Sequence, residues 1–600
     1  MKKYIFLLTA LLLWGQLMAK DGYWQQRVNY NINILLNTDK HSFTGKTVLE
    51  YTNNSNEVLY ELYFHLYNNA FQPNSEMDVF SRTVQDPDRR VGERISKLNA
   101  AEEGHMHVTN ILVNGIPCEA EEQGTILHVR VEKGITEKAT IEFDFSGQVP
   151  LQIRRSGRNN AEGIEYSMSQ WYPKLCEFDT DGWHPNPYVG REFYGVWGDF
   201  QVSITLPANY VVAGGGILLN ESECAVEKEM KKFRTNTWKF KAENVHDFVW
   251  AADPDYEVIT SQVKDGPLMK FYFQGNQPYA ETWKQATQLL TQAFEILSSN
   301  YGKYPYPVYN FIQGGDGGME YPMATLITGN RKLPSLVGVG VHEGAHSWFQ
   351  GLLGTNESLY AWMDEGFTSY ASTEVMNRLF PTTAEPHHED GVSGYVNLAQ
   401  SGMEEPLTTH ADHFKTNYAY SLAAYSKGET YLHQVRTIVG DDVFKNVMLS
   451  YFNTWSFKHP TSDDFIRIAE KESGLVLDWY DEYFVKTTKT IDYAVDTVIQ
   501  TKQKLSIVLD RIGDMPMPCE VTVQFQNGKS CVYYIPFELM RGVKNKGVLP
   551  EDWRTAKPWR WCDKKYTLNL TTSDPITKVT IDANLGVADI DLSNNSFPKK

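Results

Sequence analysis

Cysteine is scarce in this sequence, with six residues of this type among 600. None of them forms a C-x-x-C pair, which argues against a metal site built from cysteines. Three lie in the first half of the chain and three near its end, so disulfides within separate domains cannot pair them all. We therefore expect mostly isolated thiols at Cys118, Cys176, Cys224, Cys519, Cys531 and Cys562.

Long apolar runs are almost absent. The exception is the N-terminus, where Lys2 and Lys3 precede an apolar run over residues 4–14, and a passable cleavage site ends at Ala19. This order is typical of a secretory signal peptide, and the run is too short to span a bilayer comfortably. We expect a signal peptide over residues 1–19, no stable membrane insertion, and an exported protein, periplasmic or secreted.

Positive charge is in deficit, because 56 Lys and Arg face 74 Asp and Glu and the formal net charge is −18 at pH 7. An acidic chain of this kind is a poor partner for nucleic acid or an anionic membrane. Its 42% hydrophobic and 22% charged content is ordinary for a globular protein. At 600 residues the chain is too long for one core, so several domains are expected.

The spacing of apolar residues divides the chain into three parts. Residues 20–260 contain short runs in which apolar and polar residues alternate, and this pattern predicts a β-rich N-terminal domain. Residues 261–490 have helical spacing instead. Residues 491–600 return to alternation, with Asn527-Gly528 as a hairpin signal. We predict a multi-domain α+β fold with a mainly helical middle domain and a small β-sandwich-like domain at the end.

The middle part carries the motif His342-Glu343-Gly344-Ala345-His346, and eighteen residues separate it from Glu365. On a helix, histidines four positions apart lie on one face and can reach the same ion. Two imidazoles and one carboxylate make a three-ligand zinc site whose fourth position is open, as in catalytic zinc sites. The sequence therefore predicts one Zn²⁺ per chain, held by His342, His346 and Glu365, with Glu343 close to it but not bound.

Two neighbouring features complete the local prediction. Gly344 is unfavourable inside a helix by about 1 kcal/mol relative to Ala. A tightly packed site could require a residue without a side chain at this position. Residues 362–367 read as the start of a second helix, in which Asp364 suits the N-terminal turn. By contrast, we expect His387-His388 to lie in a solvated surface loop among Glu and Pro residues.

With these motifs, the chain resembles the M1 family of zinc metallopeptidases, which are gluzincins of the aminopeptidase type. Gly317-Gly318-Met319-Glu320-Tyr321 is similar to the family's G-x-M-E-N motif, and Tyr425-Ser426-Lys427-Gly428 is similar to its Y-x-K-G segment. The resemblance runs from about residue 28 to residue 490 and implies a thermolysin-like catalytic domain. Tyr321 departs from it, because Asn is usual there. The β-rich end also replaces the helical C-terminal domain that covers the site in many members, so the cleft could be more open.

The resemblance implies a role for each motif residue. Glu343 would take a proton from the attacking water and pass it to the leaving amine. Tyr425 would donate a hydrogen bond to the oxyanion. In the G-x-M-E-N-like segment, Glu320 would bind the free ammonium of the substrate. The residues of the substrate-binding set are Gly317, Gly318, Met319 and Glu320, together with Gln170, which would line the first subsite.

The resulting hypothesis is a zinc-dependent aminopeptidase that hydrolyses N-terminal residues from peptides. One rival is an endopeptidase with the same zinc chemistry. A second rival is a catalytically silent peptidase fold that serves as a peptide-binding module. The presence of all the expected catalytic groups disfavours this second rival.

Overall fold

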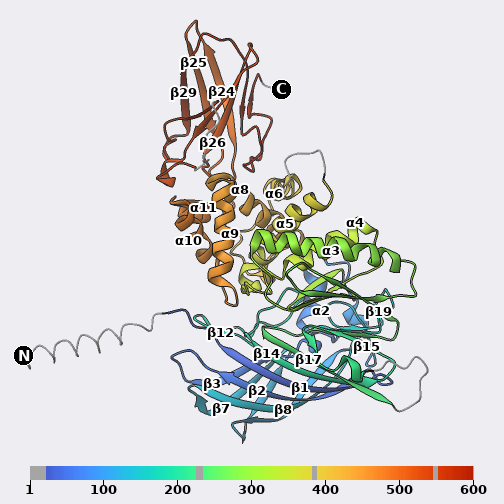
Figure 1. The fold of residues 1–600 in the computed structure, drawn as a ribbon. Helices are drawn as coiled ribbons and strands as arrows, with labels where there is room; N and C mark the ends of the chain where they lie inside the picture. The colour runs from blue at the N-terminus through green and yellow to red at the C-terminus, as the bar shows by residue number, and fades with distance from the viewer. Residues whose placement is uncertain (1–21, 225–233, 382–387, 545–551, 599–600) are drawn as a thin grey trace, which may run out of the picture.

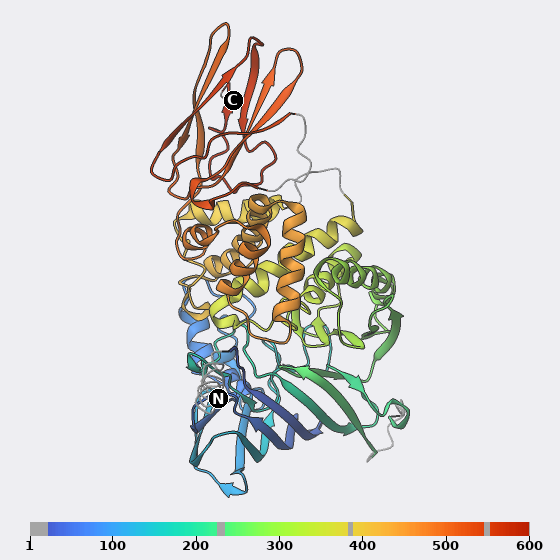
Figure 2. The same cartoon turned by 60° about the vertical axis from the view of Figure 1, so that its left-hand side comes forward.

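The computed structural model describes residues 22–224, 234–381, 388–544 and 552–598. The predicted signal peptide and His387 lie outside these ranges. Three parts are stacked along the molecule, with the N-terminal β-rich part at one end, the helices in the middle and the C-terminal β part at the other end (Figures 1 and 2). This arrangement confirms the predicted multi-domain α+β fold.

The N-terminal part is built on an eight-stranded sheet in which β1 pairs with β2 in the antiparallel sense and with β14 in the parallel sense. Alternate residues of β1, including Val28 and Ile32, are fully buried, as its sequence pattern predicts. In spatial order the sheet contains β16 (Ile217–Leu218), β17 (Thr235–Val245), β14 (Gly198–Pro207), β1 (Arg27–Asn37), β2 (Ser42–Thr52), β8 (Lys138–Gln148), β4 (His105–Val113) and β5 (Ile116–Pro117).

Smaller sheets and helix α2 (Glu76–Thr83) complete this part. One four-stranded sheet contains β15 (Val211–Gly214), β18 (Trp250–Asp253), β10 (Tyr166–Met168) and β9 (Gly157–Arg158). A second contains β11 (Lys174–Leu175), β3 (Leu59–His65), β7 (Ile126–Ile135) and β6 (Ala120–Gln123), and β12 (Phe178–Asp179) pairs with β13 (Gly182–Trp183).

The middle part begins with a five-stranded sheet of β19 (Tyr256–Gln262), β20 (Leu268–Gln274), β21 (Val308–Gln313), β23 (Ala324–Ile327) and β22 (Gly318–Tyr321). The predicted boundary at residue 260 falls inside β19, so strand pairing assigns that strand to the middle part. The helices of this part are α3 (Ala280–Tyr301), which connects β20 to β21, and then α4 (Leu333–Ala345), α5 (Glu357–Leu379), α6 (Glu389–Ser401), α7 (Asn417–Ser421), α8 (Gly428–Val439), α9 (Asp441–Trp455), α10 (Ser462–Ser473) and α11 (Asp478–Phe484).

The C-terminal part consists of two sheets and is sandwich-like. The Asn527-Gly528 hairpin joins β26 to β27, and Gly528 has a φ of +81°, which suits glycine. One sheet contains β24 (Tyr493–Gln500), β25 (Lys504–Arg511) and β29 (Lys565–Thr571). The other contains β28 (Trp553–Thr555), β27 (Ser530–Ile535), β26 (Cys519–Phe525), β30 (Ile576–Ile581) and β31 (Ser596–Phe597).

Short helices connect the larger elements. Most are 3₁₀ turns, whereas η5 (Leu422–Lys427) is a π-helix between α7 and α8. The 3₁₀ turns are η1 (Tyr67–Phe71), η2 (Ile95–Lys97), η3 (Glu221–Glu223), η4 (Ala411–His413) and η6 (Glu538–Met540).

Asp86 ties the N-terminal part to the helices of the middle part. Its two carboxylate oxygens each accept a hydrogen bond at 2.7 Å from the backbone N–H groups of Asn417 and Tyr418, at the start of α7. The Asn417 side chain also donates to the Asp86 carbonyl at 2.8 Å. These bonds satisfy donors that a helix N-terminus leaves free, and they hold the segment after α2 against α7 and η5.

All six cysteines are free thiols, in agreement with the expectation from their spacing. Three of them, Cys176, Cys224 and Cys519, are buried. Within the parts of the chain that the structure describes, no helix combines the length and the apolar character needed to cross a bilayer.

The expected surface position of His388 is wrong. The side chain is buried and stacks on Tyr370 with ring centroids 4.4 Å apart. Its Nδ1 lies 2.8 Å from an oxygen of Glu429, and its Nε2 lies 3.2 Å from an oxygen of Glu374. Two carboxylates from α8 and α5 therefore draw this histidine inward, which composition alone does not reveal.

We expect His388 to stabilise the fold in a pH-dependent manner. Burial lowers its pKa, but hydrogen bonds to Glu374 and Glu429 outweigh burial, so the pKa is raised above the ordinary value. The contribution is therefore complete below about pH 6.5, the unfolded pKa, and is lost as the pH rises through the raised folded pKa. The other groups facing this ring are Tyr370, His433 and, through Glu374, Arg436.

His388→Gln should lower stability at pH 6 by about 1.5–3 kcal/mol and flatten its decline between pH 6 and 9, as measured by chemical denaturation. The matched control is His107→Gln, which removes an exposed histidine 2.9 Å from Glu122. An unchanged pH profile in the His388 variant would contradict the assignment.

Candidate active site

The two motif histidines lie at the C-terminal end of α4. His342 is in the last turn, and His346 follows the helix with φ −57° and ψ −19°, which continues the helical path. Their Nε2 atoms are consequently 3.3 Å apart. His346 is almost completely buried, and the His342 side chain is partly exposed.

Gly344 is explained by the packing of α4 on α3. A Cβ atom at this position would lie 2.9 Å from the ring of Phe294, which leaves no room for a side chain. The helix interior therefore accepts the unfavourable glycine because α4 and α3 approach closely.

Glu365, from α5, completes a triangle of ligand atoms. Its Oε2 lies 3.1 Å from Nε2 of His342 and 3.3 Å from Nε2 of His346. A tetrahedral zinc site with bonds near 2.0–2.1 Å places neighbouring ligand atoms about 3.3 Å apart. The three side chains therefore fit one zinc ion, both in chemical type and in spacing.

Asp364 lies in the first turn after a kink in α5, as the sequence predicts for the start of a helix. Although α5 spans Glu357–Leu379, Tyr360 is non-helical (φ −128°, ψ 39°), and Asp364 follows this break, fully buried. Its Oδ1 is 2.7 Å from Nδ1 of His346, and Thr368 Oγ1 is 3.1 Å from the same nitrogen. A carboxylate on the far nitrogen fixes the orientation of a metal-binding imidazole and increases its basicity. Two consecutive residues of α5 therefore have different tasks. Asp364 orients the His346 imidazole, and Glu365 supplies the third atom of the metal-ligand triangle.

Glu343 and Glu320 lie beside the ligand triangle. Both are at least nine-tenths buried, and both line the same cavity. Burial, followed by the nearby Glu320 charge, raises the pKa of Glu343 well above its usual value. Glu320 Oε2 is 4.0 Å from Nε2 of His346. Glu343, which is suited to proton transfer, and Glu320 are therefore both close to a molecule bound at the triangle.

The glycine-rich segment before Glu320 allows this close approach. A Cβ at Gly318 would overlap the Glu343 carboxylate, and Gly317 has a φ of +96°, a conformation that favours glycine. Met319 points away from the cavity into an apolar cluster that also contains Tyr321. Gln170 is not among the residues lining the cavity; its amide nitrogen is 3.2 Å from Asp247 and 3.3 Å from the Tyr321 hydroxyl.

Tyr425 projects from the π-helix η5. Its hydroxyl donates a hydrogen bond to Oε1 of Glu365, and its ring stacks on His342 with centroids 5.8 Å apart. Burial and the Glu365 charge raise its pKa well above the ordinary value, so the hydroxyl keeps its proton. A π-helical turn changes the direction of side chains within a helix and is frequent at functional sites.

A cavity of about 660 Å³ lies between the N-terminal and middle parts. Its lining includes the metal-ligand triangle together with Glu320, Glu343 and Tyr425. Residues of the described C-terminal part do not contribute to its lining. The N-terminal part contributes the segment around Asp86, so it covers the site from a side that the sequence did not predict. The lining also includes Arg191, whose guanidinium lies 4.0 Å from the centroid of the Tyr420 ring.

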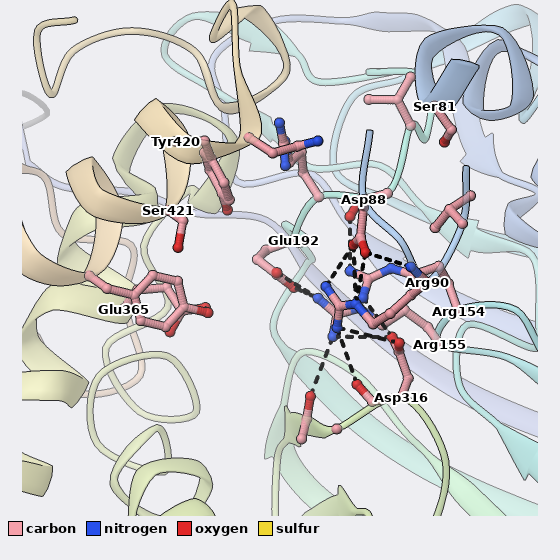
Figure 3. Close-up of a pocket in the computed structure, with 18 of the residues that line it drawn as sticks. Ser81, Asp88, Arg90, Arg154, Arg155, Glu192, Asp316, Glu365, Tyr420 and Ser421 are labelled. Atoms are coloured by element: carbon pink, nitrogen blue, oxygen red, sulfur yellow. Dashed lines mark hydrogen bonds and ion pairs between the residues drawn. The ribbon is translucent and has the colours of Figure 1, made fainter. Parts of the chain in front are cut away.

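A group of arginines and carboxylates forms the wall opposite Glu365 (Figure 3). Arg154 is 2.8 Å from Asp316, and Arg155 donates to both oxygens of Glu192 at 2.5 Å. The side chains grouped on this wall are Asp88, Arg90, Arg154, Arg155 and Asp316, with Glu192 between them and the metal-ligand side. The sequence analysis missed all of them, because four separate segments contribute them and none stands in a recognisable motif.

The sequence and the fold are both similar to those of known proteins. Residues 291–484 match the Peptidase family M1 domain. This segment is a peptidase family M1 domain. Aminopeptidase B of Homo sapiens is 29% identical over 187 residues, which are 29% of this chain and 26% of that protein. Leucine aminopeptidase 2 of Aspergillus fumigatus is 25% identical over 396 residues, which are 60% of this chain and 59% of that protein.

The match to human aminopeptidase B therefore spans about a quarter of that protein's length. Among solved structures, the M1 zinc metallopeptidase from Deinococcus radiodurans superposes with a TM-score of 0.55 at 17% identity and covers 78% of this chain and 95% of that chain. A variant crystallised with L-tryptophan gives a TM-score of 0.54 at 18% identity, with 78% and 96% coverage. At this identity the likeness establishes a shared fold.

The contact between Asp364 and His346 predicts a measurable effect on metal binding by the M1 domain. Asp364→Asn should lower zinc affinity by about 10- to 100-fold, measured by competition with a chromogenic chelator. The control is Asp442→Asn, an exposed residue in the first turn of α9. Equal zinc affinities for the Asp364 variant and the unaltered chain would show that Asp364 does not orient His346.

Proposed function

We propose that this protein is a zinc-dependent aminopeptidase that removes N-terminal residues from peptides. The observation that carries the proposal is the triangle of His342, His346 and Glu365 with the buried Glu343 and Glu320 beside it. The peptidase family M1 domain over residues 291–484 and the aminopeptidase names of its relatives also support it.

Three side chains would hold the metal, and two more would carry out the chemistry. Zinc bound to His342, His346 and Glu365 would polarise the substrate carbonyl and acidify water. Glu343 would accept a proton from the attacking water and deliver it to the leaving amine.

Tyr425 would stabilise the oxyanion. Its hydroxyl is protonated and already directed at the ligand Glu365, so the same O–H can turn to an oxygen of the substrate. Loss of one such donor typically lowers the rate by about 10²–10³-fold. Tyr425→Phe should therefore act on kcat more than on KM.

Glu320 supports an exopeptidase over the rival endopeptidase. Its carboxylate lies beside His346 inside the cavity, where it would pair with a free ammonium and where a longer chain would have to displace it. The complete set of catalytic groups also argues against a silent peptide-binding fold.

The proposed function can be tested with aminoacyl fluorogenic amides that carry either a free or an acetylated amine, with and without chelator. We expect hydrolysis of the free amines only, abolished by chelation and restored by zinc. Glu343→Gln should retain zinc and lose about 10²–10⁴-fold in kcat. Cleavage of the acetylated amides at an equal rate, unchanged in Glu320→Ala, would instead establish the endopeptidase.

Gly318 provides a second test, because a side chain at this position displaces the Glu343 carboxylate. Gly318→Ala should lower kcat/KM by about 10²-fold through misplacement of that group, while zinc content stays at one per chain. Gly338→Ala in α4 is the matched control, because its new Cβ would meet Met376 at an ordinary 3.7 Å. Full activity in the Gly318 variant would contradict the role of Glu343.

We further propose that residues 1–19 direct export and are then removed. Expression of the full chain in a Gram-negative host should yield a periplasmic protein whose first residue, by N-terminal mass spectrometry, is Lys20. Recovery of a cytoplasmic protein that retains Met1 would contradict this.

A further inference from the structure

The backbone of η5 and the start of α8 meet the backbone of α5 at two glycines. Gly366 directly follows the metal-ligand residue Glu365, and Gly428 comes three residues after Tyr425. A Cβ atom at Gly366 would lie 2.4 Å from Cα of Gly428, and one at Gly428 would lie 2.8 Å from Cα of Gly366. The absence of both side chains therefore allows the close approach that brings the Tyr425 hydroxyl to Glu365.

This contact sets the separation of the two elements, but it does not fix the rotation of η5 about its own axis. Side chains that interdigitate hold one helix against rotation on another, and two glycines supply none. The rotation decides where Tyr425 points, because side chains project outward from a helix in fixed directions. A directional contact elsewhere on η5 would supply the missing constraint, and Lys427 makes such a contact.

The ammonium group of Lys427 bonds to two segments outside η5. Its Nζ donates to Oε1 of Glu404 at 2.7 Å and to the carbonyl oxygen of Thr487 at 3.2 Å. Glu404 lies between α6 and η4, and Thr487 follows α11. The Lys427 side chain is 1% exposed and the Glu404 side chain is 4% exposed, so bulk water does not compete for this pair.

Two aromatic rings complete the surroundings of this ammonium. Nζ lies 5.1 Å from the ring centroid of Phe484 in α11 and 5.8 Å from that of Tyr395 in α6. Both distances are within the range of a cation–π interaction, and both rings are fully buried. Lys427 is therefore fixed by contacts with α6, with α11 and with the segment that contains Glu404.

A buried ion pair is a costly way to fill this space. Because desolvation offsets most of the attraction between the charges, apolar side chains of similar size often give equal or greater stability. The pair differs from an apolar contact in that its bonds are short and directional. Its distinguishing effect on η5 is therefore geometric, and Tyr425 lies two residues away on the same π-turn.

We propose that Lys427 is a positioning residue for Tyr425. Paired with Glu404, it holds η5 in the rotation at which the Tyr425 hydroxyl faces the metal-ligand triangle. The contact between Gly366 and Gly428 sets the distance. Lys427 is not among the residues that line the cavity, so it acts through Tyr425 and not on the substrate. The inference deepens the proposed aminopeptidase function and rests on it.

The orientation of Tyr425 can be observed by fluorine NMR without turnover. Meta-fluorotyrosine placed at position 425 of the zinc-loaded full chain should give a narrow signal, because this ring is stacked on His342. Lys427→Met should shift or broaden that signal as the ring samples other positions, with the zinc content unchanged. The control is Lys445→Met, which removes an exposed lysine from α9 and should leave the signal as it was.

A double-mutant cycle tests whether Lys427 acts on catalysis through Tyr425. Lys427→Met should lower kcat for alanine amides by about 10- to 100-fold, the effect of misplacing a catalytic group by about 1 Å, with little change in KM. In a Tyr425→Phe background the same change should cause no further loss of kcat, because the hydroxyl that it misplaces is already absent. Losses that multiply in the double variant would show a merely structural role and overturn the proposal.

A second variant keeps the test decisive if Lys427→Met does not fold, since that change leaves the buried Glu404 without a partner. Lys427→Met combined with Glu404→Leu replaces the pair with apolar side chains and should restore the midpoint of chemical denaturation. We expect its kcat to stay about 10-fold or more below that of the unaltered chain. Full kcat in this folded variant would overturn the proposal, because packing alone would then position Tyr425.

The spectroscopic and kinetic measurements separate this inference from the proposed function. If the zinc-loaded unaltered chain hydrolyses no aminoacyl amide, the aminopeptidase is refuted, and the fluorine signal still supports or refutes the positioning role. Hydrolysis by the unaltered chain, together with an unchanged kcat and an unchanged fluorine signal in Lys427→Met, would refute the positioning role alone.

Discussion

The site depends on two imidazole nitrogens and one carboxylate oxygen that face each other at 3.1–3.3 Å. These atoms are lone-pair donors, and such groups crowd together in a protein interior only when a shared proton or cation joins them. Every neighbouring element serves to hold this arrangement. Helix α4 spaces the imidazoles, α5 brings Glu365 and Asp364, and η5 places the Tyr425 hydroxyl on the remaining carboxylate oxygen.

The N-terminal part contributes directly to the site, in addition to supporting the helices. It contributes Arg155 and Glu192 to the cavity wall, and Asp86 holds α7 next to the π-helix that carries Tyr425. In this chain the β-rich C-terminal part lies beyond the helices and away from the cavity (Figure 1). The N-terminal segment near Asp86 therefore forms part of the cavity wall, on a side that the sequence analysis expected to be more open.

The wall opposite the metal ligands explains how so many charges coexist. Arg154 and Arg155 pair with Asp316 and Glu192 inside the cavity. The cavity carboxylates that have no guanidinium partner, Glu320 and Glu365, thus lie on the side of the metal-ligand triangle. A cavity with this polarity attracts a cationic group to one end and leaves a polar, neutral wall at the other.

Some features of the fold and of the site can be predicted from the sequence, and others cannot. The three-part fold, the grouping of His342, His346 and Glu365, and the hairpin at Asn527-Gly528 follow from the sequence, because they depend on periodicity or on a fixed spacing along the chain. Gly344 was noted as unusual, but only the ring of Phe294 explains it. His388 was misplaced because the polar residues around it suggested solvent, whereas Glu374 and Glu429 draw it into the interior.

The sequence by itself determined the local elements and the chemistry of one motif, since neighbours along a helix have fixed relative positions whatever the rest of the chain does. Only the tertiary structure decided that Asp364 supports His346, that Gln170 lies outside the cavity lining, and that Lys427 pairs with Glu404. The physical reason is that these groups meet through the packing of α5, η5 and the N-terminal loops, whose separation along the chain leaves no periodic signal.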